Sequence, residues 1–480
     1  MTEMQTITIA KGDGIGPEIM DSTIKILKAS GVPLQYEEID VGEKVYLSGN
    51  TTGISEEAWA TIRKNKAFLK APITTPQGGG YKSLNVTIRK TLGLYANVRP
   101  CKTFRPFIPA SCKDFDMVIV RENEEDLYAG IEYQQTNEAI EAIKLISKPG
   151  SERIIRYAFE YAKVYGRKKV TCMSKDNIMK HTDGMFHATF KQIAKEYPEI
   201  EAEHSIIDIG SARIAANPED FDVIVTLNLY GDIVSDIMAQ VAGSVGVSGS
   251  SNVADGRAMF EAIHGSAPDI AGQDIANPCG LLHGAILMLD YLGMSDYARK
   301  IESAALCTME EGIHTADLYQ EGISTRKVGT KEFTQAVIER LGKSPKNIKV
   351  RSRNASAINF KMSELIKEEK TLIGVDLYLD WSEDGRDAGV LGDAITGLTS
   401  DKFSFDLITN RGVKVWPGTM PETYRSDQWR LRFKSANGKI NNNDIINLMS
   451  KVTEAGYDIV KTDNLYNFNG KRAYSLAQGE

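Results

Sequence analysis

The feature that most restricts the fold is an alternation of strand-like and helix-like segments along roughly the first 340 residues. Thr6–Ala10 is a short apolar run typical of a buried strand, and Pro17–Ser30 follows it with apolar residues at helical spacing. Further strands are expected at Val118–Val120, Val170–Met173 and Val223–Val225, and further amphipathic helices at Ile154–Tyr165, Met185–Tyr197 and Ile233–Val241. This alternation predicts an α/β fold.

Length and composition bound the class of protein. A chain of 480 residues is too long for one ordinary core, so two or three domains are expected. The net charge of -7 argues against a general nucleic-acid or anionic-membrane binder. Neither a secretory signal nor a spanning helix is evident. The five cysteines show no CxxC spacing, so we expect reduced thiols in a cytoplasmic protein.

The character of the chain changes after Leu341. Gly342–Ser352 is polar, basic and contains a proline, as linkers do. Beyond it, strands are expected at Thr371–Trp381, Phe403–Thr409, Val413–Trp416, Trp429–Phe433 and Tyr457–Val460, and helices at Ala388–Thr396 and Asn443–Ala455. This pattern predicts a small α+β sandwich, with a ferredoxin-like arrangement as one form of it. It shows no catalytic motif, which favours a packing or oligomerisation module.

The segment Ser83–Pro100 (SLNVTIRKTLGLYANVRP) gathers polar groups suited to carboxylates. It contains Ser83, Asn85, Arg89 and Arg99, and Arg121 ends a later apolar run. Guanidinium forks bind carboxylates through two hydrogen bonds at once. The cluster indicates a small substrate with several carboxylates. The alternative is a set of scattered surface arginines that form weak ion pairs.

Paired carboxylates suggest a metal site. Asp232 and Asp236 are four residues apart, so on a helix they share one face. The strand Val223–Val225 runs into this helix, and open α/β sheets bind ligands at the carboxyl ends of strands. Oxygen ligands alone suit Mg²⁺ or Mn²⁺. Asp208, after another apolar run, could supply a third carboxylate. The alternative is an ordinary solvated helix face.

Two residues could transfer protons. Lys175 follows the strand Val170–Met173, and a lysine held near cations loses proton affinity and can act as a base. Tyr128 follows an acidic run, and a phenol can protonate a carbanion. Without other information, each is as consistent with an ordinary surface residue.

Three segments rich in small residues could approach a ligand with their backbone. Lys11–Gly16 lies between a strand and a helix but does not match G-x-G-x-x-G, so it indicates a tight turn more than a phosphate loop. Thr74–Gly80 is lined by hydroxyl groups. His264–Pro278 includes Asp269, whose carboxylate could accept hydrogen bonds from a ribose and would repel a 2′-phosphate.

Together these segments resemble the isocitrate/isopropylmalate dehydrogenase family of β-decarboxylating dehydrogenases over residues 1 to about 340. The motifs, in family order, are GDGIGPEI, TTPQGGGYKSLNVTIRKTLGLYANVRP, VIVRENEEDLYAGIE, SKDNIM, LNLYGDIVSD and HGSAPDIAGQDIANP. The resemblance implies an α/β fold that is not a standard Rossmann fold. It implies a large cofactor domain at 1–95 and 250–341, and a small domain with a dimer clasp at 96–249. A linker at 342–352 and an additional C-terminal α+β domain at 353–480 would follow.

The resemblance also implies residue roles. The substrate carboxylates would be bound by Ser83, Asn85, Arg89, Arg99 and Arg121, with Tyr128 and Lys175 as catalytic residues that also contact the substrate. Asp232 and Asp236 would bind Mg²⁺ or Mn²⁺ together with Asp208 of a second subunit, which would also supply Lys175. The cofactor residues would be Thr74 and Thr75 near the nicotinamide and, towards the adenosine, His264, Gly265, Asp269, Ile270 and Asn277.

The implied reaction is oxidative decarboxylation of isocitrate to 2-oxoglutarate and CO₂ by a homodimer or a larger oligomer. Polar Ser83 and Asn85 favour a third carboxylate over an isopropyl group. Homoisocitrate and 3-isopropylmalate dehydrogenases are the nearest alternatives, and a non-catalytic regulatory subunit is a more distant one. Asp269 and Ile270 replace the Lys-Tyr pair of phosphate-binding members, which favours NAD⁺ over NADP⁺. Arg326 or Lys327 could still reach a 2′-phosphate.

Overall fold

The structure is a computed structural model that describes residues 4–50, 52–74, 83–351, 358–418 and 421–480. Its chain divides into two compact units. The first unit consists of Met1–Ala129 and Leu145–Met362, and the second of Gly130–Lys144 and Ser363–Glu480. No helix in the described ranges is both long enough and apolar enough to cross a bilayer.

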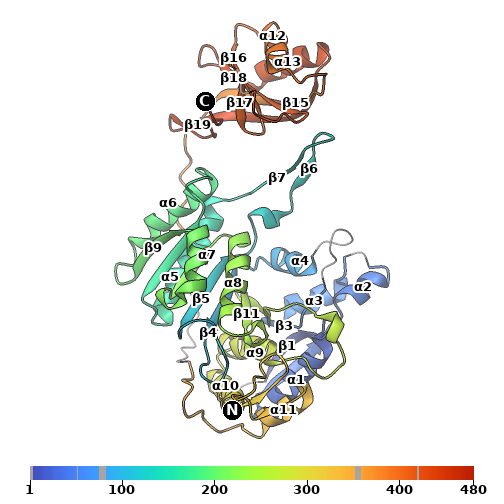
Figure 1. Ribbon diagram of the computed structural model, residues 1–480, viewed down its shortest axis with the longest axis vertical. Coiled ribbons are helices and arrows are strands. Elements are labelled where there is room, and N and C mark those ends of the chain that lie inside the picture. The colour runs from blue at the N-terminus through green and yellow to red at the C-terminus, as the bar shows by residue number, and fades with distance from the viewer. Residues whose placement is uncertain (1–3, 51, 75–82, 352–357, 419–420) are drawn as a thin grey trace. The chain divides into compact units, whose positions relative to one another are not determined.

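A sheet of ten strands organises the described part of the first unit (Figure 1). In spatial order the strands are β2 (Leu34–Glu38), β1 (Gln5–Ala10), β3 (Ala67–Lys70), β12 (Arg257–Ala262), β11 (Gly249–Ala254), β4 (Ala96–Lys102), β5 (Asp116–Glu122), β10 (Val223–Thr226), β8 (Lys169–Ser174) and β9 (Glu201–Ile206). Adjacent strands are parallel on both outer parts of the sheet. In the middle, β12, β11, β4 and β5 are joined by antiparallel pairings. This mixed sheet confirms an α/β fold that differs from the parallel Rossmann sheet.

Helices cover this sheet. They are α1 (Gly16–Ser30), α2 (Glu43–Leu47), α3 (Glu56–Lys64), α4 (Leu84–Thr91), α5 (Lys148–Val164), α6 (Thr182–Ala194), α7 (Ile207–Ala216), α8 (Asn228–Val241), α9 (Cys279–Tyr291), α10 (Ser295–Glu310) and α11 (Thr330–Ile338). Short 3-10 turns occur at η1 (Leu127–Ala129), η2 (Pro218–Asp220), η3 (Val245–Val247) and η4 (Pro268–Ile270). Two-residue strands β13 (Ile313–His314) and β14 (Arg326–Lys327) form a separate pair. Every strand and helix predicted above for this part of the chain is present, with ends shifted by a few residues.

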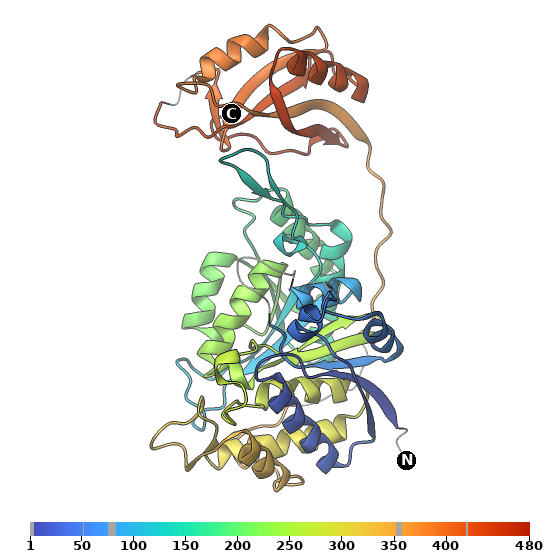
Figure 2. The same ribbon diagram turned by 90° about the vertical axis from the view of Figure 1, so that its right-hand side faces the viewer.

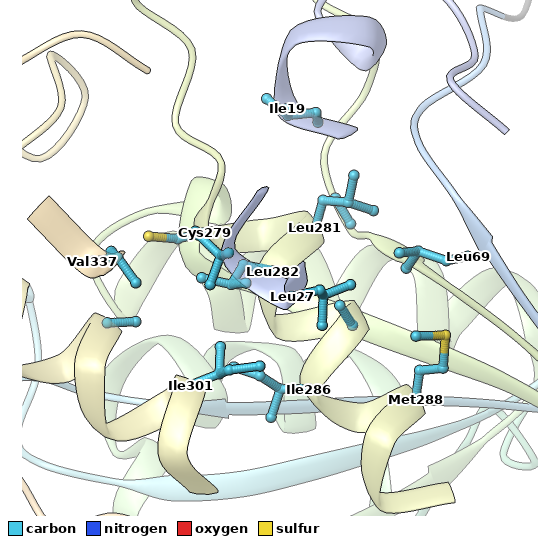
Figure 3. Close-up of a cluster of buried hydrophobic side chains, with 14 of the residues drawn as sticks. Ile19, Leu27, Leu69, Cys279, Leu281, Leu282, Ile286, Met288, Ile301 and Val337 are labelled. Atoms are coloured by element: carbon cyan, nitrogen blue, oxygen red, sulfur yellow. The ribbon is translucent and has the colours of Figure 1, made fainter. Parts of the chain in front are cut away.

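Two large cores hold helices against the sheet. Ile19 and Leu27 of α1 pack with Leu69 of β3 and Leu282 of α9 in the first core (Figure 3). The second core joins α5 and α6 to the strands β4, β5, β8 and β10. Apolar residues at helical spacing therefore hold the helices against the sheet whose strand ends carry the candidate site.

The C-terminal part of the second unit is a ferredoxin-like sandwich. Its sheet has the order β17 (Val413–Trp416), β16 (Phe403–Asn410), β18 (Gln428–Ser435), β15 (Lys370–Asp380), β19 (Asp458–Phe468) and β20 (Lys471–Arg472). Both helices, α12 (Ala388–Thr396) and α13 (Asn442–Glu454), lie on the same face of this sheet (Figure 2). Alternate residues Val375, Leu377 and Leu379 of β15 are buried in their shared core. The predicted α+β arrangement is confirmed here.

The hairpin of β6 (Glu132–Gln134) and β7 (Ile140–Ala142) belongs to the second unit, although it is far from residues 363–480 in sequence. The sequence analysis assigned it to the domain at 96–249, and the division of the first unit into a large and a small domain stays a prediction. Buried Thr136 donates a hydrogen bond to buried Asp427, and Glu138 pairs with Arg386 at 2.6 Å. Lys461 pairs with Glu141 at 3.0 Å. The C-terminal sandwich thus holds the hairpin through buried and charged contacts.

We predict that Asp427→Ala loosens this hairpin selectively, because Thr136 and the Glu138 N–H both lose their acceptor. A lost buried hydrogen bond costs about 1–3 kcal/mol, so amide hydrogen exchange of β6 and β7 should accelerate roughly tenfold or more. Exchange–mass spectrometry measures this, with Glu454→Ala, an exposed change on α13, as the control. Equal hairpin exchange in both variants would contradict the prediction.

Candidate active site

The candidate site begins where β5 and β10 end side by side. The two strands are parallel, with Arg121 opposite Thr226, so the end of β5 lies next to the start of α8. Asp126 accepts a hydrogen bond from the backbone N–H of Leu229 in the first turn of α8 at 2.9 Å. Gly231 is required by close approach, because a Cβ there would lie 2.5 Å from Cγ of Arg121. The Arg121 side chain can therefore lie directly against α8.

Asp232 is the centre of this cluster. Its Oδ1 accepts from Arg121 Nη1 at 2.5 Å and lies 3.4 Å from Arg99 Nη2. Its Oδ2 accepts the Tyr128 hydroxyl at 2.5 Å. The Arg121 guanidinium also lies over the Tyr128 ring, 4.9 Å from its centroid, and donates to Asn228. The structure therefore brings together four of the predicted residues, Arg99, Arg121, Tyr128 and Asp232.

Burial and charge shift the proton affinities in this cluster. Burial lowers the pKa of Arg121 to about 10, and the nearby Arg99 guanidinium acts in the same direction. Burial raises the pKa of Asp232, but Arg121 and Arg99 outweigh it and hold that pKa below its usual value. Burial and the hydrogen bond to Asp232 raise the pKa of Tyr128, which keeps it a phenol at neutral pH. Crowded cations and a protonated donor favour an anionic ligand.

Asp236 lies one helical turn after Asp232, as predicted from the spacing. Its side chain is 66% exposed and is 3.6 Å from Arg99. Partial desolvation of its carboxyl and the charge of Asp232 raise the Asp236 pKa despite the opposing effect of Arg99. A divalent cation would relieve this repulsion, and each carboxylate oxygen has a further lone pair to offer. The donor set of the two aspartates therefore fits a hard cation such as Mg²⁺.

Helix α4 supplies the remaining predicted substrate residues. Ser83 precedes its first turn, and Asn85 lies within that turn. The Asn85 Oδ1 is buried and has no hydrogen-bond partner among the described residues, so this acceptor is open to a donor group of a ligand. Arg89, one turn later, donates to Glu261 at 2.8 Å. The N-terminus of a helix favours negative charge, which fits a carboxylate beside Ser83 and Asn85.

The predicted nicotinamide residue Thr74 is held by two contacts. Its backbone N–H donates to Asp13 at 2.9 Å, and its hydroxyl lies 2.9 Å from that of Ser266. Gly14 has φ +59, and a Cβ there would lie 2.0 Å from the Ser266 carbonyl oxygen. The segment Lys11–Gly16 is thus a tight turn that packs against the Ser266 loop, as its sequence indicated. Thr75 lies outside the described residues.

The other predicted cofactor residues follow β12. Burial lowers the pKa of His264, and its Nε2 is buried without a hydrogen-bond partner among the described residues. Asn277 is buried and donates to Asp317 at 3.0 Å. Asp269 and Gly265 are exposed, and Ile270 is half-buried. Arg326 pairs with Glu332 at 3.0 Å, and the Lys327 ammonium lies 5.8 Å from the Tyr319 ring centroid.

A cavity of about 570 Å³ is lined by residues of α8 and of the loop that follows β12. Asp236 lines it from α8, and His264 and Gly265 line it from the loop after β12. A predicted metal ligand and two predicted cofactor residues thus face the same space.

Lys175 and Asp208 form a separate pair. Lys175 follows β8, and its Nζ donates to Asp208 of α7 at 2.9 Å. This contact lowers the pKa of Asp208. Within the described residues, no hydrogen bond or ion pair joins either residue to Tyr128, Asp232 or Asp236. Lys175 and Asp208 are therefore separate from Tyr128, Asp232 and Asp236 within one chain.

Three potential metal ligands in the described structure lie close together, namely Asp176, which follows Lys175 in the sequence, His187 and His204. The Nδ1 of His187 is 2.7 Å from Asp176. The two imidazole rings are stacked, with centroids 3.5 Å apart and planes 13° apart. Because their lone pairs lie in nearly parallel planes, both rings cannot point at one ion in this arrangement. The cluster is better explained as hydrogen bonding that holds the Lys175 loop.

Comparison with known proteins agrees with this arrangement. Residues 6–337 match the family model described as isocitrate/isopropylmalate dehydrogenase. The chain belongs to the isocitrate/isopropylmalate dehydrogenase family. Residues 370–480 match the C-terminal domain of bacterial isocitrate dehydrogenase, which identifies the second unit's sandwich.

Individual relatives extend this result. A protein of Rickettsia bellii named isocitrate dehydrogenase [NADP] is 51% identical over 100% of both chains. An Arabidopsis thaliana protein named isocitrate dehydrogenase [NAD] catalytic subunit 5, mitochondrial, is 44% identical over 70% of this chain and 88% of its own. The crystal structure of the TT0538 protein from Thermus thermophilus has a TM-score of 0.94 and 40% identity, and covers 99% of this chain and 96% of its own. The α/β fold with an added C-terminal domain is therefore shared over the full length.

Several residues of the site escaped the sequence analysis. Asn228, Ser235 and Glu261 bind the three buried arginines, and Lys70 binds Glu261. Lys70 ends the apolar run FLK, and Glu261 ends the apolar run MFE. A charged residue at the end of an apolar run was therefore the signal that could have indicated both.

Proposed function

We propose that the protein catalyses the oxidative decarboxylation of isocitrate to 2-oxoglutarate and CO₂ with a pyridine nucleotide as oxidant. The observation that carries this proposal is the cavity shared by Asp236, His264 and Gly265, which adjoins a cluster of buried guanidinium groups. It offers a place for a polyanion and a metal next to a place for a cofactor. The names of the full-length relatives support the same activity.

The side chains have distinct roles in this proposal. Arg89, Arg99 and Arg121 bind carboxylates of the substrate, and Ser83 and Asn85 bind the third one. Lys175 of a second subunit takes the proton from the substrate hydroxyl as hydride leaves for the nicotinamide. Tyr128, a phenol held beside Arg121, then protonates the enolate left by loss of CO₂. The polar pair Ser83 and Asn85 favours isocitrate over substrates with an apolar third group.

Asp232 and Asp236, with Asp208 of the second subunit, would hold Mg²⁺ or Mn²⁺. Bound there, the ion would supply Lewis-acid polarisation of the substrate oxygen and hold the α-carboxylate.

We predict that the purified protein, in its natural oligomer, oxidises isocitrate only when Mg²⁺ or Mn²⁺ is present. Removal of the metal by a chelator should reduce the rate to background, because the hydroxyl proton then leaves an unpolarised oxygen. The measurement is nucleotide reduction at steady state with isocitrate, homoisocitrate and 3-isopropylmalate in parallel. A higher kcat/KM for either alternative substrate would contradict the proposal, as would no turnover at all.

The separation of Lys175 and Asp208 from Tyr128 within one chain supports a site shared between two copies. We propose a homodimer, in the cytoplasm, in which each copy contributes Lys175 and Asp208 to the site of the other.

We predict that Lys175→Met and Tyr128→Phe subunits are each inactive alone and regain activity when mixed. A mixed dimer has one site with both residues intact, so random exchange should restore about a quarter of wild-type activity. Activity is measured after unfolding and refolding the two variants together, with each variant refolded alone as control. No recovery, in mixed dimers shown to form, would mean that Lys175 and Tyr128 act within one subunit.

We further propose that NAD⁺ is the preferred nucleotide. Asp269 is an exposed carboxylate in the loop that would face the ribose, and it would repel a 2′-phosphate. Arg326 is paired with Glu332, which reduces its availability to a phosphate. The name of the Rickettsia bellii relative points to NADP, so both nucleotides are compared first on the wild-type protein.

We predict that Asp269→Lys with Ile270→Tyr shifts the preference towards NADP⁺ at least tenfold, because a cation replaces a repulsive carboxylate. The measurement is kcat/KM for NAD⁺ and NADP⁺, with Asp255→Lys, a surface change of the same charge elsewhere, as the control. An unchanged ratio, or a wild-type protein that prefers NADP⁺, would contradict the assignment of Asp269.

A further inference from the structure

A row of polar side chains crosses the middle of the sheet on five neighbouring strands. Lys70 of β3 lies opposite Glu261 of β12, and Asn252 of β11 lies opposite Asn97 of β4. Asn97 is in turn opposite Arg121 of β5. None of these residues is more than 5% exposed. Strands covered on both faces are usually apolar, so this polar row needs a reason.

Hydrogen bonds connect the row to two of the substrate-binding arginines. The Oε1 of Glu261 accepts from Arg89 Nη2 and from Asn252 Nδ2, each at 2.8 Å. Asn252 Oδ1 accepts from Asn97 Nδ2 at 2.8 Å, and Asn97 Oδ1 accepts from Arg99 Nε at 2.7 Å. Arg89 and Arg99 are therefore joined through three buried side chains.

The two oxygens of Glu261 have separate tasks. Oε1 holds Arg89 and Asn252, whereas Oε2 is 2.8 Å from Lys70 Nζ. Burial raises the pKa of Glu261, but Lys70 and Arg89 outweigh it and hold that pKa well below its usual range, so Glu261 remains a carboxylate. Lys70 thus balances the charge of Glu261 and leaves one oxygen for the arginine.

We propose that Glu261 and Asn252 are positioning residues, which fix Arg89 relative to Arg99 before the substrate arrives. Arginine has a flexible side chain, and ordering it on binding costs affinity. A guanidinium group already held by a buried carboxylate avoids that cost. This inference rests on the proposed function, since it assigns the two arginines to carboxylates of one substrate. Affinity would then depend on residues that do not contact the substrate.

Two double variants with equal net charge test this role. Lys70→Met/Glu261→Gln retains an acceptor oxygen towards Arg89 and removes the ammonium that the amide would otherwise face. Lys70→Met/Glu261→Met removes the acceptor as well. The Gln variant keeps a neutral acceptor for buried Arg89, whereas the Met variant leaves Arg89 without its carboxylate, so the Met variant should unfold at a lower temperature. Thermal unfolding verifies this in each case.

We predict that the Gln variant binds isocitrate with a dissociation constant within about threefold of wild type. The Met variant should bind it at least tenfold more weakly, because Arg89 loses one charge-assisted hydrogen bond. Calorimetric titration with isocitrate and Mg²⁺ measures the dissociation constant without turnover. Nucleotide affinity should stay unchanged in both. Equal affinities of the two variants, whether both weak or both strong, would overturn the positioning role.

Asn252→Asp gives a second test should the Met variant fail to fold. The acid would be fully buried against the Glu261 carboxylate, so it takes up a proton and can donate to Glu261 Oε1 in place of the amide, and the isocitrate dissociation constant should stay within about threefold of wild type, whereas Asn252→Leu removes this donor and should raise the constant at least tenfold. An unchanged constant in Asn252→Leu would overturn the inference. Wild-type protein that binds no isocitrate would instead contradict the proposed function, so the two failures are distinguishable.

Discussion

The burial of three guanidinium groups against the central sheet is the constraint on which the first unit depends. An unpaired buried cation costs several kcal/mol, so each group needs a fixed acceptor. Asp232 serves Arg121 and Arg99, Glu261 serves Arg89, and Asn228 completes the contacts of Arg121. The same requirement explains Gly231, because any side chain there would displace Arg121 from α8. The charges that would bind a polyanionic substrate are thus the ones that the fold must compensate.

The mixed pairing of the sheet makes this compensation possible. The antiparallel pairings of β12, β11, β4 and β5 bring polar side chains from three separate segments of the sequence into one row. A fully parallel sheet would have needed a covering crossover between each pair of strands. The β11–β12 hairpin instead places Asn252 directly beside Asn97 and near Glu261. The strand order of the sheet therefore also determines which buried charges and polar groups can pair beside the site.

The second unit combines two segments that are far apart in the sequence. The sandwich of residues 370–480 holds the β6–β7 hairpin through Asp427, Arg386 and Lys461. The second unit's first segment begins at Gly130, two residues after Tyr128, a predicted catalytic residue. The fold of the sandwich was predictable from alternating apolar residues, whereas its attachment to the hairpin was not.

The sequence by itself determined the elements and indicated many of the candidate site residues. Local periodicity gave the strands and helices, and the four-residue spacing of Asp232 and Asp236 placed both on one face of α8. Ordered motifs indicated the arginines and Tyr128. The tertiary structure alone decided which charges pair, the role of Lys70, Glu261 and Asn252, and the separation of Lys175 and Asp208 from Tyr128. The periodicity of apolar residues follows from the backbone geometry of one segment. Charge compensation depends instead on which strands become neighbours, and the sequence of a single segment does not show its neighbours.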